Sequence, residues 1–194
     1  MSDRVSILPN TSPFVARWSP RAFDPDFELS IADLMLCFEA ARWSYSQSNG
    51  QSWRFVYGLR GDTTFPLILD SMEQYNKIWA KNASALILVC SKNIWEDEQR
   101  SPKPGHLFDT GAAAMSFSLQ AQELGLITHP MSGFNQEAMR AAFSIPEQFT
   151  AHAVLVVGKM GDPTTDLDTY NQARETPSGR KPLDEIAKNR FDFE

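Results

Sequence analysis

Hydrophobic and polar positions along the chain follow two different periods, and the alternation between them predicts interleaved helices and strands. Apolar residues recur at helical spacing over 34–41, directly after Ser30, a residue type that often begins helices. The continuous apolar run 85–91 predicts a strand that is buried on both faces, and the largely apolar segment 151–159 predicts another buried strand. A run rich in aromatic and β-branched residues, 53–59, predicts a further strand.

The segments between these elements complete the predicted order. We expect helices over 65–81, 108–126 and 135–143, a short strand over 127–134, and a polar loop over 44–52. Because helices and strands intermingle along the chain, the pattern favours an α/β or α+β fold built around one sheet.

No internal repeat and no clear boundary divides the chain. Residues 1–194 are therefore expected to form a single domain. Within it, the Pro-, Asp- and Ser-rich segment 1–28 is interpreted as an N-terminal arm. The polar, turn-rich segment 160–194 is interpreted as a C-terminal extension that includes a last short helix.

Composition and charge exclude several function classes. The net charge is -6 and no run of four basic residues occurs, so no nucleic-acid partner is expected. The longest purely apolar run, 85–90, is too short to span a bilayer, so no membrane partner is expected either. The first residues lack the pattern of a secretory signal, and Cys37 and Cys90 both lie in apolar segments. Free, buried thiols are typical of a cytoplasmic protein.

Common catalytic and metal-binding motifs are missing from the sequence. It contains no GxxxxGK[ST], GxGxxG, GxSxG, HExxH or CxxC pattern. The three histidines show no ligand spacing with the two cysteines, so no metal site is expected. We therefore predict no catalytic side chain, and demanding chemistry would require a bound cofactor.

A small basic cluster stands near the start of this acidic chain. Arg17 and Arg21 lie four residues apart, with Ser19 between them. One interpretation is a solvated turn that leads into the first long helix. The other is an anion site, most plausibly for a phosphate, because guanidinium groups engage phosphate oxygens in pairs.

Seven segments, taken in order, carry a resemblance to a known family. They are RWSPRAF, AARWSYSQSNGQSWRF, NASALILVC, DTGAAAMSFSLQAQELGL, HPMSGF, IPEQFTAHAVLVVGK and SGRKPLDEI. In these segments the chain closely resembles the FMN-dependent nitroreductases from about Ala16 to Ile186. The resemblance implies an α+β fold with a central mixed or antiparallel sheet flanked by helices. It also implies an intertwined homodimer that holds FMN at its interface.

The resemblance further implies an activity. Members of the family pass two electrons from NAD(P)H through FMN to a nitroaromatic, a quinone or a similar small electron-poor acceptor. Two alternatives remain open at this point. One is a flavin-binding or storage module without turnover. The other is a specialised member that acts on a non-nitro acceptor such as a carbonyl, a halogenated ring or an azoline.

By the same resemblance, the basic cluster binds the FMN phosphate. Arg17, Ser19 and Arg21 match the family's motif for the phosphate and the polar flavin edge. Trp18 replaces a residue that is often basic or polar, and its backbone is expected to contact the cofactor. Arg180 matches the C-terminal basic residue that closes on the same phosphate.

A polar loop is expected to reach the flavin of the partner subunit. Its matching residues are Tyr45, Ser46, Gln47 and Asn49, whose hydroxyl and amide groups suit the ring carbonyls and nitrogens. Tyr45 and Ser52 each stand at a position where the family often has proline. The loop is therefore expected to be less rigid than in relatives.

Two further segments are expected to contact the flavin ring. Asn76 falls where the family places an amide near the pyrimidine end, and Trp79 replaces a lysine found in some relatives. Pro130, Met131, Ser132 and Gly133 match the turn whose backbone amides face flavin N5. Ser132 stands where some relatives carry glutamate, which bears on acceptor specificity.

Overall fold

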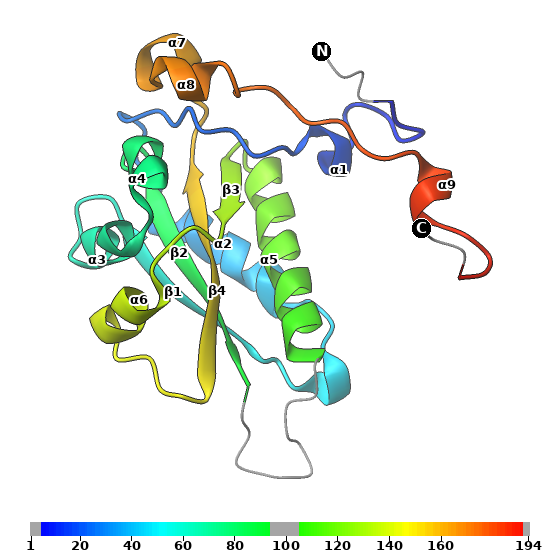
Figure 1. Ribbon diagram of the computed structural model, residues 1–194, viewed down its shortest axis with the longest axis horizontal. Coiled ribbons are helices and arrows are strands. Elements are labelled where there is room, and N and C mark those ends of the chain that lie inside the picture. The colour runs from blue at the N-terminus through cyan, green and yellow to red at the C-terminus, as the bar shows by residue number, and fades with distance from the viewer. Residues whose placement is uncertain (1–4, 94–104, 192–194) are drawn as a thin grey trace.

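The computed structural model describes residues 5–93 and 105–191, and its centre is a four-stranded sheet. The strands are β1 (Trp53–Leu59), β2 (Ala85–Lys92), β3 (Ile127–Met131) and β4 (Phe149–Gly158). Their order in the sheet is β1-β2-β4-β3, and every neighbouring pair is antiparallel (Figure 1). The sheet is therefore antiparallel rather than mixed.

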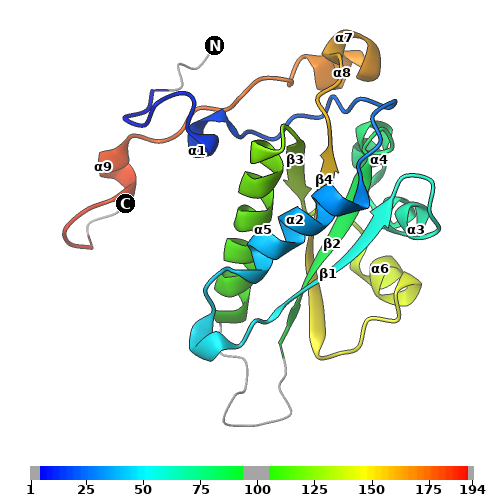
Figure 2. The same ribbon diagram turned by 180° about the vertical axis from the view of Figure 1, so that it is seen from behind.

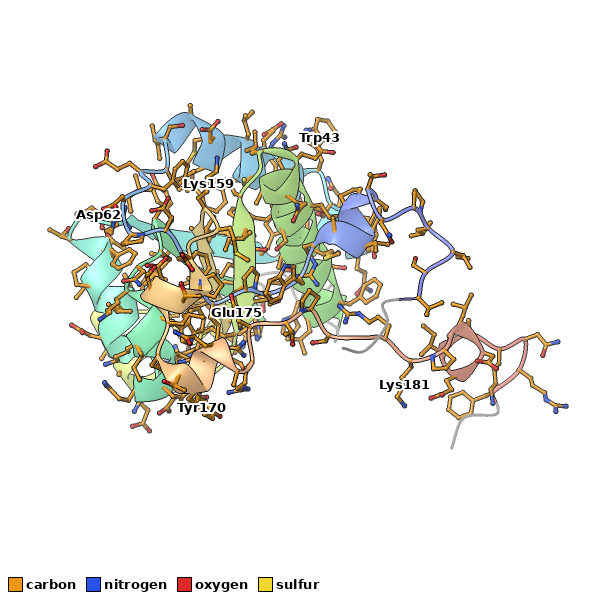
Figure 3. All side chains as sticks on the ribbon, turned by 90° about the horizontal axis from the view of Figure 1, so that it is seen from above. Trp43, Asp62, Lys159, Tyr170, Glu175 and Lys181 are labelled. Carbon is orange, nitrogen blue, oxygen red and sulfur yellow. The ribbon has the colours of Figure 1, made fainter. Side chains whose placement is uncertain are left out.

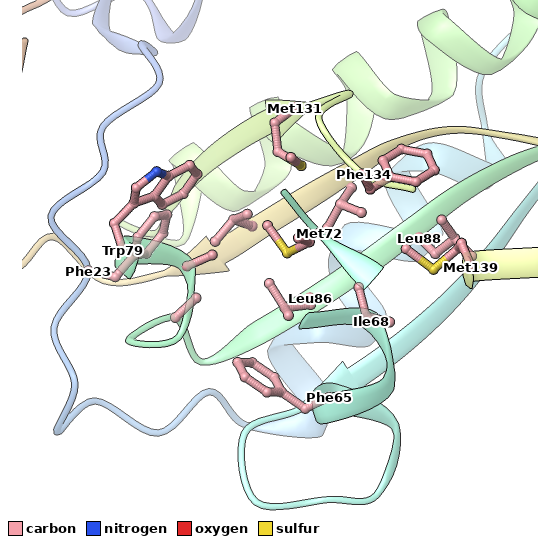
Figure 4. Close-up of a cluster of buried hydrophobic side chains, with 14 of the residues drawn as sticks. Phe23, Phe65, Ile68, Met72, Trp79, Leu86, Leu88, Met131, Phe134 and Met139 are labelled. Carbon is pink, nitrogen blue, oxygen red and sulfur yellow. The ribbon is translucent and has the colours of Figure 1, made fainter. Parts of the chain in front are cut away.

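Helices cover both faces of this sheet. The helices α2 (Ile31–Arg42) and α5 (Gly105–Glu123) lie on one face, and the helices α3 (Thr64–Ser71), α4 (Gln74–Ala80) and α6 (Gln136–Ala142) lie on the other (Figures 1 and 2). Strand β2 supplies both hydrophobic cores because successive side chains alternate between the faces. Leu86 and Leu88 belong to the α3/α6 core (Figure 4), whereas Ile87 and Val89 belong to the α2/α5 core.

The predicted elements are confirmed with shifts at their ends. Ser30 caps α2, since its Oγ accepts from the Asp33 backbone N–H at 3.0 Å. The segment 65–81, expected as one helix, forms α3 and α4 with a break between them. The break has a tertiary cause, because Met72 is extended and forms an isolated β-bridge with Phe134.

The N-terminal arm and the C-terminal extension run side by side over one end of the sheet (Figures 1 and 2). The arm contains α1 (Pro13–Ala16), and the extension contains α7 (Pro163–Asp166), α8 (Thr169–Gln172) and α9 (Leu183–Ile186). Backbone hydrogen bonds from Asp24 N to Lys159 O and from Gly161 N to Ala22 O join the two segments at 3.0 and 2.9 Å. Residues distant in sequence therefore meet here.

The thiol groups and the described helices agree with the sequence expectations. Cys37 and Cys90 are both free and buried, and burial raises the pKa of each thiol to about 11. Over residues 5–93 and 105–191, no helix combines the length and the apolar character needed to cross a bilayer.

Candidate functional site

A cavity of about 370 Å³ lies where the arm, the C-terminal extension and β3 meet. The four residues that the sequence assigned to phosphate binding line it together with Trp18, although Arg180 is more than 150 positions from the others. The lining consists of Arg17, Trp18, Ser19, Arg21, His129, Arg174, Thr176, Pro177, Ser178 and Arg180. The predicted convergence of the two basic segments is therefore found in a single cavity.

The local conformation of the arm presents its basic side chains together. Helix α1 ends at Ala16, and the backbone of Arg17, the next residue, is extended. A spacing of two residues puts side chains on the same side of an extended chain. Arg17, Ser19 and Arg21 have this spacing. The Arg17 Nη1 group donates to Ser19 Oγ at 3.4 Å, at the long limit of a hydrogen bond.

A buried carboxylate stands beside these cations. Glu175 Oε1 accepts from the backbone N–H groups of Arg21 at 2.7 Å and Ala22 at 2.9 Å. Its Oε2 lies 3.9 Å from Arg21 Nη1, and the Glu175 side chain is only 2% exposed. Burial lowers the pKa of the Arg21 guanidinium and nearby Arg174 lowers it further, whereas Glu175 acts in the opposite direction. Figure 3 labels Glu175, which joins the extension to the arm through these bonds.

His129 forms a neutral polar part of the wall. Its Nδ1 lies 2.9 Å from the Pro20 carbonyl oxygen, and because a carbonyl only accepts, Nδ1 carries the hydrogen. Burial lowers the pKa of His129 to about 4, and the nearby Arg21 and Arg17 cations contribute in the same direction. At neutral pH the ring is therefore uncharged.

Trp79 lies behind this wall rather than in the cavity. It is 1% exposed, and its ring centroid lies 4.6 Å from that of His129 and 6.1 Å from that of Phe23 (Figure 4). The residue that replaces the lysine of some relatives is thus a core side chain in this structure. Its indole ring packs against the His129 ring.

Of the predicted turn 130–133, Pro130 and Met131 are the last residues of β3, and only Ser132 and Gly133 lie beyond the strand. Gly133 contacts Asn76, which was also predicted to lie near the ring system. The Gly133 carbonyl accepts from Asn76 Nδ2 at 3.3 Å and from the Glu73 backbone N–H at 2.8 Å. A Cβ on Gly133 would lie 2.5 Å from Tyr75 Oη and 2.6 Å from Asn76 Nδ2. Any larger residue at this position would have to displace the Tyr75 and Asn76 side chains. Within this turn Pro130 and Ser132 are exposed.

The polar loop 44–52 lies away from the cavity in the structure. Gln47 N donates to Asp109 Oδ2 at 3.0 Å, and the Tyr45 and Phe108 rings lie 5.7 Å apart, so the loop packs on the first turns of α5. The arm and β3, which contribute to the cavity lining, lie near the other end of α5 (Figure 1). A helix of 19 residues is about 28 Å long. Within one chain, the structure does not bring Tyr45, Ser46, Gln47 and Asn49 to the cavity.

Sequence reasoning missed several residues of the site. Arg174 lies six positions before Arg180 in NQARETPSGR, so a second basic residue in the predicted segment was the available signal. His129 directly precedes the predicted turn. Lys181, the neighbour of Arg180, lies 3.7 Å from Glu185 and is not part of the lining (Figure 3).

Comparisons with known proteins agree with this architecture. The model of the nitroreductase family matches residues 59–159. An uncharacterised 15.4 kDa protein of Mycolicibacterium smegmatis is 34% identical over 142 residues, which are 69% of this chain and 93% of that protein. An oxygen-insensitive NADPH nitroreductase of Helicobacter pylori is 37% identical over 75 residues, which are 39% of this chain and 35% of that protein.

A solved structure extends the match to the whole chain. A crystal structure of an oxidoreductase containing FMN is 35% identical and superposes with a TM-score of 0.92, covering 100% of this chain and 98% of that one. The family model covers most of the sheet, including His129, and the solved structure also spans the arm and the C-terminal extension that line the cavity. The chain belongs to the nitroreductase family.

Proposed function

We propose that this protein is an FMN-dependent oxidoreductase that uses NAD(P)H and reduces a small electron-poor acceptor such as a nitroaromatic or a quinone. One observation carries the proposal. Arg17, Ser19 and Arg21 meet Arg180 across one cavity, as phosphate binding requires. The similar structure that contains FMN and the similar NADPH nitroreductase support the choice of cofactor and electron donor.

The residues around the cavity fit a phosphate dianion. Four arginines and Ser19 line the cavity, and arginine offers paired N–H donors to phosphate oxygens. The carboxylate next to them, Glu175, is directed to backbone N–H groups of the arm. A neutral His129 adds no repulsion between cations. The wall is thus strongly cationic and suits a phosphate monoester.

We assign the ring system of FMN to the turn after β3. When bound, FMN would accept two electrons as a hydride from the nicotinamide and pass them to the acceptor. The turn 130–133 would contact the ring through its backbone, and Asn76 fixes the turn by its bond to Gly133 O. The chain would supply binding and orientation, without a side-chain acid or base.

We further propose that the active form is a homodimer in which the polar loop of one subunit completes the site of the other. The distance between this loop and the cavity in one chain supports the proposal. So do exposed apolar side chains on the outer sides of α2 and α5, namely Met35, Leu36, Phe108 and Met115. A second copy of the chain would cover them.

A spectral titration followed by turnover tests this function. FMN added to the purified apoprotein is expected to bind with a shifted flavin spectrum. NADH or NADPH should then bleach it under anaerobic conditions, and a nitroaromatic or a quinone should restore it. Failure to bind FMN would refute the proposal. FMN binding without any reduction would identify a flavin-binding module instead.

A further inference from the structure

The C-terminal extension contributes half of the cavity wall, and a buried carboxylate joins it to the arm. Five lining residues come from 174–180, namely Arg174, Thr176, Pro177, Ser178 and Arg180. Glu175 lies within this segment but is not a lining residue, and its carboxylate accepts from the backbone N–H groups of Arg21 and Ala22. The two halves of the wall therefore meet at this residue.

The hydrogen bonds of Glu175 fix the C-terminal extension to the N-terminal arm. Its carboxylate is nearly inaccessible to solvent and accepts two backbone N–H groups that lie more than 150 positions away in the sequence. Hydrogen bonds to an ionised acceptor are stronger than neutral ones, and they stabilise more when buried. A third link lies beside them, since Arg21 Nη1 approaches the Arg174 carbonyl at 3.5 Å.

We propose that Glu175 is a positioning residue for phosphate recognition, holding Arg174 and Arg180 over the arm that carries Arg17 and Arg21. This inference rests on the proposed function, because it assigns the cavity to the FMN phosphate. Glu175 itself does not touch the phosphate. It acts by fixing the extension, so that binding does not have to order a mobile segment of chain.

If the charge of Glu175 acted on FMN by electrostatics alone, removing it would raise the affinity for FMN, whereas loss of a positioning residue would lower it. The sign of the change in FMN affinity therefore tests the inference. A carboxylate close to a phosphate repels it, so removal of the Glu175 charge would strengthen phosphate binding if the wall stayed in place. If Glu175 holds the wall, its removal weakens binding despite the more positive potential. The direction of the change in FMN affinity therefore separates the two roles.

The test compares Glu175→Gln and Glu175→Ala with the wild type and with Glu185→Gln. Glu185 is a matched control because it lies in the same extension, is exposed, and pairs with Lys181. Dissociation constants for FMN and for riboflavin, which lacks the phosphate, are measured by flavin fluorescence at fixed ionic strength. Amide hydrogen exchange of the peptide 17–23 in the apoproteins reports the bonds of Glu175 directly.

We expect both Glu175 variants to exchange the amides of Arg21 and Ala22 faster than the wild type. We expect the Kd for FMN to rise at least about tenfold, as for the loss of one charge-assisted hydrogen bond, while riboflavin affinity and the Glu185→Gln control stay unchanged. Unchanged riboflavin binding also shows that the variants are folded.

Other outcomes overturn the inference. Unchanged amide exchange would show that Glu175 does not anchor the extension. Unchanged or tighter FMN binding would show that the anchor does not position the phosphate-binding residues. An equal loss of FMN and riboflavin affinity would assign Glu175 to general stability. A wild type that binds no FMN would refute the proposed function itself, whatever the exchange data show.

Discussion

The substitution Arg17→Ala tests the assignment of the cavity most directly. Arg17 directly follows α1, is half-buried, and lines the cavity together with three further arginines. The hydrogen bond from its guanidinium to Ser19 Oγ is long, at 3.4 Å. Because Arg17 is only half-buried, we expect the substitution to change the free energy of unfolding of the apoprotein by about 1 kcal/mol.

The effect on FMN binding should be larger. Two unit charges 4 Å apart attract by about 4 kcal/mol at an effective dielectric constant near 20. Desolvation of a half-buried guanidinium offsets part of this, which leaves about 1.5–3 kcal/mol, as for other hydrogen bonds to charged groups. The Kd for FMN should then rise about 10- to 100-fold, since 1.4 kcal/mol corresponds to a factor of ten.

The assay is a fluorescence titration of apoprotein with FMN and, separately, with riboflavin. Arg17→Lys keeps the charge but loses the paired donors, so its FMN affinity should lie between those of the wild type and Arg17→Ala. Arg42→Ala is the control, because Arg42 is exposed and pairs with Glu39 on α2, outside the cavity lining. Unchanged FMN affinity in Arg17→Ala, or an equal loss of riboflavin affinity, would refute the phosphate assignment.

Three other predictions concern stability and assembly. Gly58→Ala should destabilise the protein by about 2–3 kcal/mol in urea unfolding, because its Cβ would collide with the Phe65 backbone; near-wild-type stability would contradict this. His129 is neutral when folded, with a pKa of about 4 against about 6.5 unfolded. Its stabilisation is complete above pH 6.5 and is lost as the pH falls toward 4, so the wild type should lose about 2 kcal/mol more than His129→Gln between pH 7 and 4.5. Equal losses would show that His129 is not the group responsible. Gly111 is exposed on α5, and a Cβ placed there would meet no described atom within 4 Å apart from its own helix backbone, so Gly111→Leu probes the proposed subunit contact without a Cβ clash inside the chain. Light scattering should show a weaker dimer, and an intact dimer would exclude a close helix contact there.

Much of the fold follows from local pattern. The continuous apolar run in β2 predicts a strand covered on both faces, and the structure gives it two hydrophobic cores because alternate side chains enter opposite faces. The start of α2 follows from Ser30, whose side chain satisfies a backbone N–H that the helix cannot pair itself. These features depend on neighbours within a few residues, so one sequence suffices to predict them.

Other features depend on contacts between distant segments. The break between α3 and α4 arises from the β-bridge of Met72 with Phe134. The local sequence around Met72 does not predict this bridge. The interpretation of Trp79 changed for the same reason. By sequence it occupied a possible cofactor position, whereas in the structure it is a buried support for His129.

Some residues of the site could likewise be proposed from the sequence, whereas other assignments depend on the tertiary and quaternary structure. Arg17, Ser19, Arg21 and Arg180 could be proposed from the sequence, because a spaced basic motif and a family resemblance both indicate phosphate chemistry. The assignment of the polar loop and of the turn residues to a flavin stays a prediction. It depends on a cofactor and on a second subunit that a single chain does not contain.

The sequence by itself determined which residues carry charge and which segments form helices and strands. Only the tertiary structure decided that the arm and the C-terminal extension meet at the end of the sheet, with Arg174 and His129 in the same wall. It also showed Glu175 as the contact between them. The physical reason is that the energies of hydrogen bonds and of charge–charge interactions depend on distance in space. For residues more than 150 positions apart in the sequence, only the packing of the core sets that distance.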